Sequence, residues 1–194
     1  MIRRARTLVR ERGVRGLWFG VLAWTRVYRR LELVELSLRP PPPILHTPLS
    51  LDFGFLTATE SEDARARLEH GERCFVARQA GAVVSSRWIT ERRAYVAYLD
   101  ARLDLEPDEV YVSETYTRPS QRGHGVSAAA GTRLAHVLAA EGRRRIVAAV
   151  LPDNRSGRRA YEKAGYRSIG RIGYVKLGPW RRDFLRSEGH GDAP

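Results

Sequence analysis

The residues best suited to chemistry form a glycine-punctuated loop at 121–127, Gln-Arg-Gly-His-Gly-Val-Ser. The loop follows a strand-like run that Pro119 ends, and it precedes an Ala- and Leu-rich segment that is typical of a helix. The first N–H groups of a helix have no intrahelical acceptor, and the helix dipole is positive there. Gly123 and Gly125 allow close backbone approach to a ligand, and Arg122 adds a positive charge. The pattern predicts a phosphate site, although a tight strand-to-helix turn has the same composition.

Other kinds of binding site fit the sequence less well. The loop lacks the Gly-Lys-Ser/Thr of a Walker loop, and Ala128 stands where the dinucleotide fingerprint needs its third glycine. Cys74 is the single cysteine, which excludes an intramolecular disulfide and a cysteine-cluster metal site. The five histidines show no metal-ligand spacing, so we expect no metal.

Two segments resemble the motifs of the GNAT (Gcn5-related N-acetyltransferase) superfamily. The loop after Tyr116-Thr117-Arg118-Pro119 resembles its acetyl-CoA-binding motif, Arg/Gln-x-x-Gly-x-Gly/Ala after a strand and a proline. Asn154, Tyr161 and the pair Gly165-Tyr166 resemble its second segment. The resemblance covers residues 50–178 or so. It departs at Ser127, where Gly or Ala is usual, and at Gly157, where Ala is usual.

The resemblance implies that an acyl-CoA donor and an amine acceptor meet between two parallel strands, here 109–117 and 145–150. The backbone near Tyr116 and Thr117 would pair with the pantetheine arm like an added strand. Asn154 would belong to the same cofactor site. The pyrophosphate would be held by the loop residues Arg122, Gly123, His124, Gly125, Val126 and Ser127.

Direct attack of an amine on a thioester needs a neutral amine and a protonated leaving thiolate. Tyr161 occupies the family position that commonly protonates the thiolate; the alternative is a helix residue that packs on the sheet. Glu114 is the candidate base, directly or through a water; the alternative is a salt-bridged surface carboxylate. His124 is more simply a solvated loop residue, and Cys74 an inert core residue.

The elements that position these residues are expected in the order helix, hairpin, strand, loop, helix, strand, helix, strand. This order predicts an α/β fold of the GNAT acyltransferase kind, with a mixed central sheet and helices on both faces. Ser61 is expected to cap the first of these helices. Residues 93–105 alternate in part and suggest another strand. The last strand or hairpin falls within 166–178.

The net charge of +12 is concentrated at the N-terminus, where residues 1–30 hold nine arginines and one glutamate. Leu17, Val21, Trp24 and Tyr28 recur at helical spacing, which predicts an amphipathic helix. Its longest uncharged run is too short to span a bilayer, which takes about 20 residues, and no cleavage site for a signal peptide follows. The helix packs on the body or on a second subunit in one interpretation, and lies at an anionic membrane surface in another.

These observations divide the chain into three parts. Residues 1–45 hold the basic helix, a strand and a Pro-rich connector, residues 46–180 form the acetyltransferase domain, and residues 181–194 form a polar tail. The leading hypothesis is a cytoplasmic N-acetyltransferase that uses acetyl-CoA and acts on a small-molecule or protein amine, with no nucleic-acid partner. Two alternatives stay open: a longer-chain N-acyltransferase at a membrane surface, and a non-catalytic module that binds acetyl-CoA. A homodimer is compatible with each.

Overall fold

The computed structural model describes residues 27–187. Its strands are β1 Tyr28–Ser37, β2 Asp52–Phe55, β3 Arg73–Gln79, β4 Ala82–Glu91, β5 Arg93–Val96, β6 Ala101–Asp104, β7 Glu109–Thr117, β8 Arg145–Val150, β9 Arg167–Leu177 and β10 Trp180–Ser187. Its helices are α2 Glu62–Glu69, α3 Val126–Ala140 and α4 Arg155–Lys163, with a short 3-10 turn at Pro119–Gln121. Residues 1–26 of the predicted N-terminal helix lie outside the described residues, and residues 28–30, which were expected to end that helix, begin strand β1 instead. No helix within 27–187 has the length and apolarity to span a membrane.

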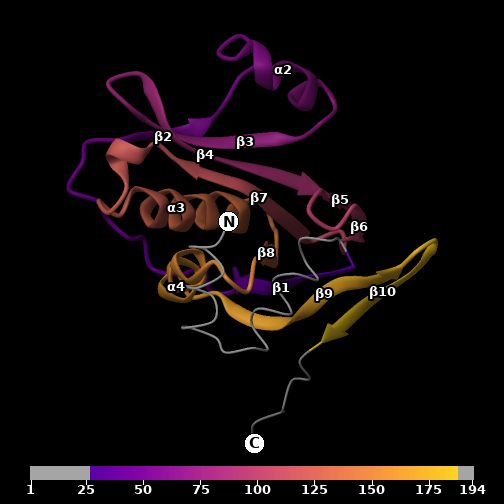
Figure 1. The fold of residues 1–194 in the computed structure, drawn as a ribbon. Helices are drawn as coiled ribbons and strands as arrows, with labels where there is room; N and C mark the ends of the chain where they lie inside the picture. The colour runs from indigo at the N-terminus through magenta and orange to yellow at the C-terminus, as the bar shows by residue number, and fades with distance from the viewer. Residues whose placement is uncertain (1–26, 188–194) are drawn as a thin grey trace, which may run out of the picture.

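Eight strands form one mixed sheet in the order β10-β9-β1-β8-β7-β4-β3-β2 (Figure 1). The pairing of β7 with β8 is parallel, and the other neighbouring pairs are antiparallel. β5 and β6 form a separate two-stranded hairpin where the sequence suggested one strand. The predicted mixed α/β sheet is confirmed.

Helices α3 and α4 cover one face of the sheet (Figure 1). Leu134 and Leu138 of α3 pack with Ile89 of β4 in one apolar cluster. Tyr161 of α4 packs against Val34 of β1, next to that cluster. These contacts fix the two helices that carry the candidate site residues.

The opposite face is covered by the β5–β6 hairpin and by α2. Val96 of the hairpin belongs to a second core cluster with Leu31 and Leu33 of β1. The guanidinium of Arg67, on α2, lies 3.8 Å from the ring centre of Trp88. Side chains alternate along a strand, so Trp88 faces away from α3. Helices therefore occupy both faces, as predicted.

β1 lies inside the sheet, paired with β8 on one side and β9 on the other. The sequence placed this strand in an N-terminal region that ends at residue 45, whereas in the structure it belongs to the same sheet as the rest. Residues 181–187 likewise lie in β10, where a polar tail was expected. The sequence predicts a strand at 31–38, but its partners β8 and β9 are far away in the chain, and β10 is too polar to be assigned as a strand from its own sequence.

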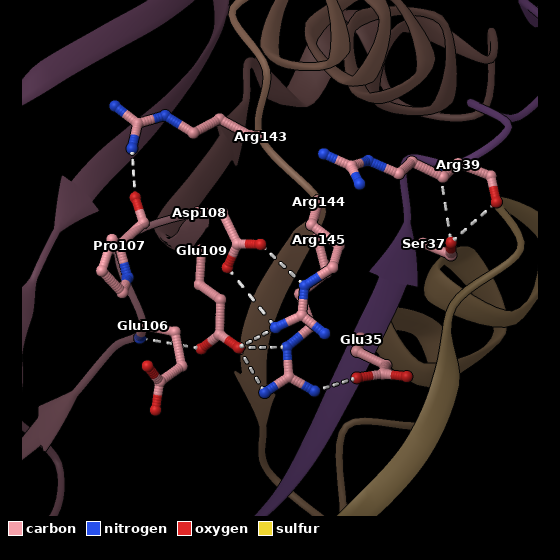
Figure 2. Close-up of polar contacts among 10 residues, drawn as sticks. All are labelled: Glu35, Ser37, Arg39, Glu106, Pro107, Asp108, Glu109, Arg143, Arg144 and Arg145. Carbon is pink, nitrogen blue, oxygen red and sulfur yellow. Dashed lines mark hydrogen bonds and ion pairs between the residues drawn. The ribbon is translucent and has the colours of Figure 1, made fainter.

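A buried ion-pair network ties β1 to its neighbours (Figure 2). Arg145 of β8 donates to Glu35 of β1 at 2.7 Å and to Glu109 of β7 at 2.6 Å. Arg167 of β9 donates to the other oxygen of Glu35 at 2.8 Å. Both carboxylates are buried, so these bonds replace the water that the charges lose on folding.

The parallel pairing of β7 with β8 stops at Val112 and Ala148, although β7 runs on to Thr117. Beyond that point, β7 pairs only with β4 among the described strands. The two parallel strands therefore separate toward their carboxyl ends, next to α3 and α4.

Candidate active site

The glycine loop leads directly into α3, as predicted. Gly123 and Gly125 have φ of 83° and 76°, values that side chains with a Cβ rarely adopt. α3 begins at Val126, and Ala129 donates the first intrahelical bond, to the carbonyl of Gly125. The N–H groups of Val126, Ser127 and Ala128 thus have no acceptor within the helix. Together with the helix dipole they make a site for an anion.

Two side chains hold this loop in place. Arg122 donates through Nε to the carbonyl of Thr117 at 3.0 Å, which leaves its exposed guanidinium at the end of β7. Thr47, in the Pro-rich connector, donates to the carbonyl of His124 at 2.7 Å. No pattern in the sequence indicates the contact between Thr47 and His124, because the two residues are far apart along the chain. His124 itself is exposed.

The end of β7 offers backbone to a ligand on the side away from β4. Tyr116 and Thr117 pair with Ser86 and Ser85 of β4. The Ser85 hydroxyl, which is buried, also donates to the carbonyl of Tyr116 at 2.8 Å. The edge that faces β8 has no strand partner here among residues 27–187, so an extended chain can pair with it.

Tyr161 lies beside this opening. It is on α4, and its ring contacts the ring of Tyr166 edge to face, with centroids 4.8 Å apart. Burial raises the pKa of the Tyr161 phenol, and the guanidinium of Arg87 and the hydroxyl of Thr115 partly offset that rise. The phenol is therefore protonated at neutral pH and available to donate a proton.

Glu114 lies at a bulge in β7. Two residues of β7, Glu114 and Thr115, stand opposite the single residue Arg87 of β4, and Glu114 has φ of 46°. Its exposed carboxylate accepts a bond from Arg67 of α2 at 2.8 Å, and Arg67 also binds Glu72. The salt-bridged state that the sequence left open is thus present, on the face opposite α3.

Asn154 caps α4. Its side-chain oxygen accepts from the N–H of Gly157 at 2.9 Å and from the hydroxyl of Ser156 at 3.0 Å. A Cβ at position 157 would lie 2.5 Å from Nδ2 of Asn154. The glycine at this unusual position is therefore explained by the tight cap. The contacts given for Asn154 are structural, at the start of the helix that carries Tyr161.

Sequence reasoning missed Arg87, which lies between β4 and α3. Its side chain is buried, and it donates to the carbonyl of Ser127, in the first turn of α3, at 2.7 Å. One feature of the sequence could have indicated this role. Arg87 is a charged residue in a strand that is otherwise made of apolar and small residues.

A cavity of about 400 Å³ lies elsewhere, on the β5–β6 side of the sheet. Its lining includes Leu33, Leu105 and Leu185 together with the paired Glu35 and Arg145, and none of the predicted site residues. Within residues 27–187, no three His, Cys, Asp or Glu side chains come together as a metal site would require.

A family model described as "Acetyltransferase (GNAT) family" matches residues 32–166. Among solved structures, the chain is similar to a GCN5-related N-acetyltransferase from Sphaerobacter thermophilus, with TM-score 0.54, 14% identity, and coverage of 88% of this chain and 57% of that one. It is also similar to a putative GNAT-family acetyltransferase from Novosphingobium aromaticivorans, with TM-score 0.52, 18% identity, and coverage of 75% and 63%. A GCN5-related N-acetyltransferase from Kribbella flavida gives TM-score 0.51, 15% identity, and coverage of 81% and 60%.

These structural similarities concern the fold, because the identities are low. The chain spans less than two thirds of the length of each of these three structures. No curated protein matches the sequence.

Proposed function

Because this chain belongs to the GNAT acetyltransferase family, we propose that it transfers an acetyl group from acetyl-CoA to an amine by direct attack in a ternary complex. The observation that carries the proposal is the convergence of three features at one end of the parallel strand pair. They are the open first turn of α3, the unpaired edge of β7 and the phenol of Tyr161. They suit, in that order, the pyrophosphate, the pantetheine arm and the leaving sulfur of an acyl-CoA.

The pyrophosphate of CoA binds at the α3 end of this arrangement. The N–H groups of residues 123–127 surround it, since that of Arg122 is donated to the carbonyl of Pro119, and the two left-handed glycines keep side chains out of its way. The Arg122 guanidinium supplies a charge that an exposed phosphate can pair with. The loop is already held by Thr47, so little ordering is needed when the ligand binds.

The pantetheine arm pairs with the edge of β7 at Tyr116 and Thr117, which places the thioester between β7 and β8. The amine attacks the carbonyl carbon, the C–S bond breaks, and Tyr161 protonates the departing sulfur. Glu114 accepts the proton of the amine, directly or through water, with the carboxylate oxygen that Arg67 does not occupy. Asn154 contributes by holding the start of α4 and therefore Tyr161.

The test is a panel of CoA thioesters and amines scored by release of free thiol. We expect acetyl-CoA to bind and to release CoA when a suitable amine is present. Tyr161→Phe should lower kcat about 10²-fold and leave KM for acetyl-CoA nearly unchanged, since a general acid contributes about 10²- to 10⁴-fold. Arg122→Glu should instead weaken acetyl-CoA binding about tenfold, the loss of one charged contact.

Tyr95→Phe and Arg65→Glu are the controls, because both side chains are exposed and belong to β5 and to α2, not to the loop or α4. Both should keep the kinetics of the natural sequence. Calorimetry that detects no heat with any CoA thioester, together with no thiol release, would reject the proposed function. A Tyr161→Phe protein with full turnover would remove only the acid from it.

A further inference from the structure

Arg87 is a buried cation without a carboxylate partner. It is 6% exposed, and no Asp or Glu of the described residues forms an ion pair with it. Its Nη2 donates to the carbonyl of Ser127 at 2.7 Å and lies 3.4 Å from that residue's hydroxyl. Its Nε is buried and has no hydrogen-bond partner. Other buried charges of the sheet, such as Glu35, are paired.

The surrounding chain is shaped to admit this guanidinium. A Cβ at Gly131 of α3 would lie 2.7 Å from Nη1 of Arg87, so the guanidinium occupies the space that the missing side chain leaves open. On the neighbouring strand β7, the bulge at Glu114 and Thr115 stands opposite Arg87 and shifts the register of the β4–β7 pairing at that point. Two elements, α3 and β7, thus enclose the arginine of β4.

Burial of an unpaired charge is costly, and burial lowers the pKa of Arg87. Arginine nevertheless stays protonated in proteins. A fixed positive charge without an anion in the resting state is suited to a negative charge that appears only during a reaction. Tyr161 reaches this place from α4, because its phenol is hydrogen-bonded to the hydroxyl of Thr115, which stands opposite Arg87 in the bulge. The phenols of Tyr161 and Tyr166 can become anionic, and both interact electrostatically with Arg87.

We propose that Arg87 is a positioning residue of the acetyl transfer: it braces the first turn of α3 and is the counter-ion of the phenolate that Tyr161 becomes. The inference rests on the proposed function. In the step concerned, the amine nitrogen bonds to the acyl carbon, the C–S bond breaks, and the proton of the Tyr161 hydroxyl passes to sulfur. The acylated nitrogen gives its surplus proton to Glu114, directly or through water, and that proton then returns through solvent to the phenolate, so no other reactant is needed.

The titratable groups that interact electrostatically with Tyr161 can be named element by element. Arg87 comes from β4, Tyr111 from β7 and Tyr166 from the turn after α4. On α4 itself, Arg158 is paired with Glu32 of β1. Among these groups, Arg87 is the cation that forms no ion pair with a carboxylate. Its removal should therefore raise the pKa of the Tyr161 phenol.

The kinetic test uses Arg87→Met, which keeps the length of the side chain and removes its charge. We expect kcat to fall about tenfold, which corresponds to about one pKa unit at the acid. Loss of the bond to the Ser127 carbonyl should also weaken acetyl-CoA binding, by no more than about tenfold. In a Tyr161→Phe background the same change should have no further effect on kcat. The control is Arg78→Met, which removes a sheet arginine that is paired with Glu60 and should leave kcat unchanged.

A second readout does not depend on activity. Tyr161 is replaced by a fluorinated tyrosine, whose phenol ionises at lower pH than that of tyrosine. The pH at which this phenol ionises is followed by absorbance in two proteins, one that keeps Arg87 and one that carries Arg87→Met. The midpoint should rise by about one unit without Arg87 and stay fixed with Arg78→Met. Arg87→Lys, which keeps the charge, should restore part of the shift.

An apolar replacement of a buried charge is usually neutral or stabilising, so Arg87→Met should fold with an unchanged or higher Tm. A midpoint that does not move, or a loss of kcat that persists in the Tyr161→Phe background, would overturn the proposal. If the natural sequence releases no thiol, the proposed function fails, whereas the titration still decides whether Arg87 acts on Tyr161.

Discussion

At the residue scale, three phenols stand out because the protein holds them away from water. Burial raises the pKa of Tyr111 to about 12, and it also raises the pKa of Tyr161 and of Tyr166. Tyr161 and Tyr166 flank the opening between β7 and β8, whereas Tyr111 belongs to the cluster under the β5–β6 hairpin. Each phenol ionises more readily in the unfolded chain than in the folded one.

This difference makes stability depend on alkaline pH. Above pH 10 the unfolded chain loses protons that the folded chain retains, so the free energy of unfolding falls as pH rises. Each such tyrosine contributes a slope of up to about 1.4 kcal/mol per pH unit. Tyr111→Phe should therefore flatten the decline between pH 10 and 12, as measured by urea unfolding at several pH values.

Tyr116→Phe is the control for that series, since it removes an exposed phenol from the same strand. Burial also raises the pKa of the Cys74 thiol, which adds a decline of the same sign, but both variants retain this residue. Identical pH profiles for Tyr111→Phe and the natural sequence would contradict the explanation.

The loop glycines, Arg122 and the end of β7 could be predicted from the sequence because they are adjacent in the chain and carry a motif. Arg87 could not, because its meaning depends on Gly131 and Ser127, which face it only after β4 and α3 have packed. The ion pair of Glu114 with Arg67 likewise joins residues far apart in the sequence. The roles of Tyr161 and Glu114 stay predictions that the kinetic variants test.

At the element scale, the N-cap of α4 depends on the absence of a side chain at position 157. Asn154 fits against Gly157 so closely that an alanine at 157 would collide with the capping amide. Gly157→Ala should therefore lower stability, although alanine normally favours a helix over glycine by about 1 kcal/mol. With Asn154→Ala the collision is gone, and Gly157→Ala should then stabilise the protein.

A double-mutant cycle measures this coupling. Asn154→Ala alone should cost about 1 kcal/mol, the usual value of an N-cap. The sign of the Gly157→Ala effect should reverse between the two backgrounds in urea unfolding. Additive effects would mean that the amide moves aside at no cost, and the explanation for the glycine would fail.

The elements themselves differed in how well the sequence specified them. α3, β8 and the β3–β4 hairpin were predicted because apolar periodicity and glycine boundaries are local features. The β5–β6 hairpin was predicted less well, since its turn contains no glycine, and Asp100 adopts φ of 48° instead. Its four-residue strands are also too short for a clear alternation.

At the scale of the whole molecule, the N-terminal strand of the described chain, β1, is an interior strand of the sheet. The strand lies between β8 and β9, far from both in sequence, so no local pattern could show its partners. Glu35 is the side chain that most directly fixes this placement, because Arg145 and Arg167 approach it from the two flanking strands. Burial opposes its ionisation, but those bonds outweigh burial and lower its pKa.

A lowered carboxylate pKa stabilises the fold above the pKa of the unfolded chain, about 4.5, and the contribution is lost as pH falls through the folded value. Glu35→Gln should cost about 2 kcal/mol at pH 7, less than for a fully buried pair because Arg145 and Arg167 are partly exposed. Glu32→Gln, on the same strand but paired with the exposed Arg158, should cost under about 1 kcal/mol. Urea unfolding from pH 7 to 3 should show the Glu35→Gln and natural curves converging toward acid, because protonation removes the same charge from both. A gap that widens as pH falls, or a Glu35→Gln cost no larger than that of Glu32→Gln, would mean that β1 is held by its backbone pairing and apolar contacts alone.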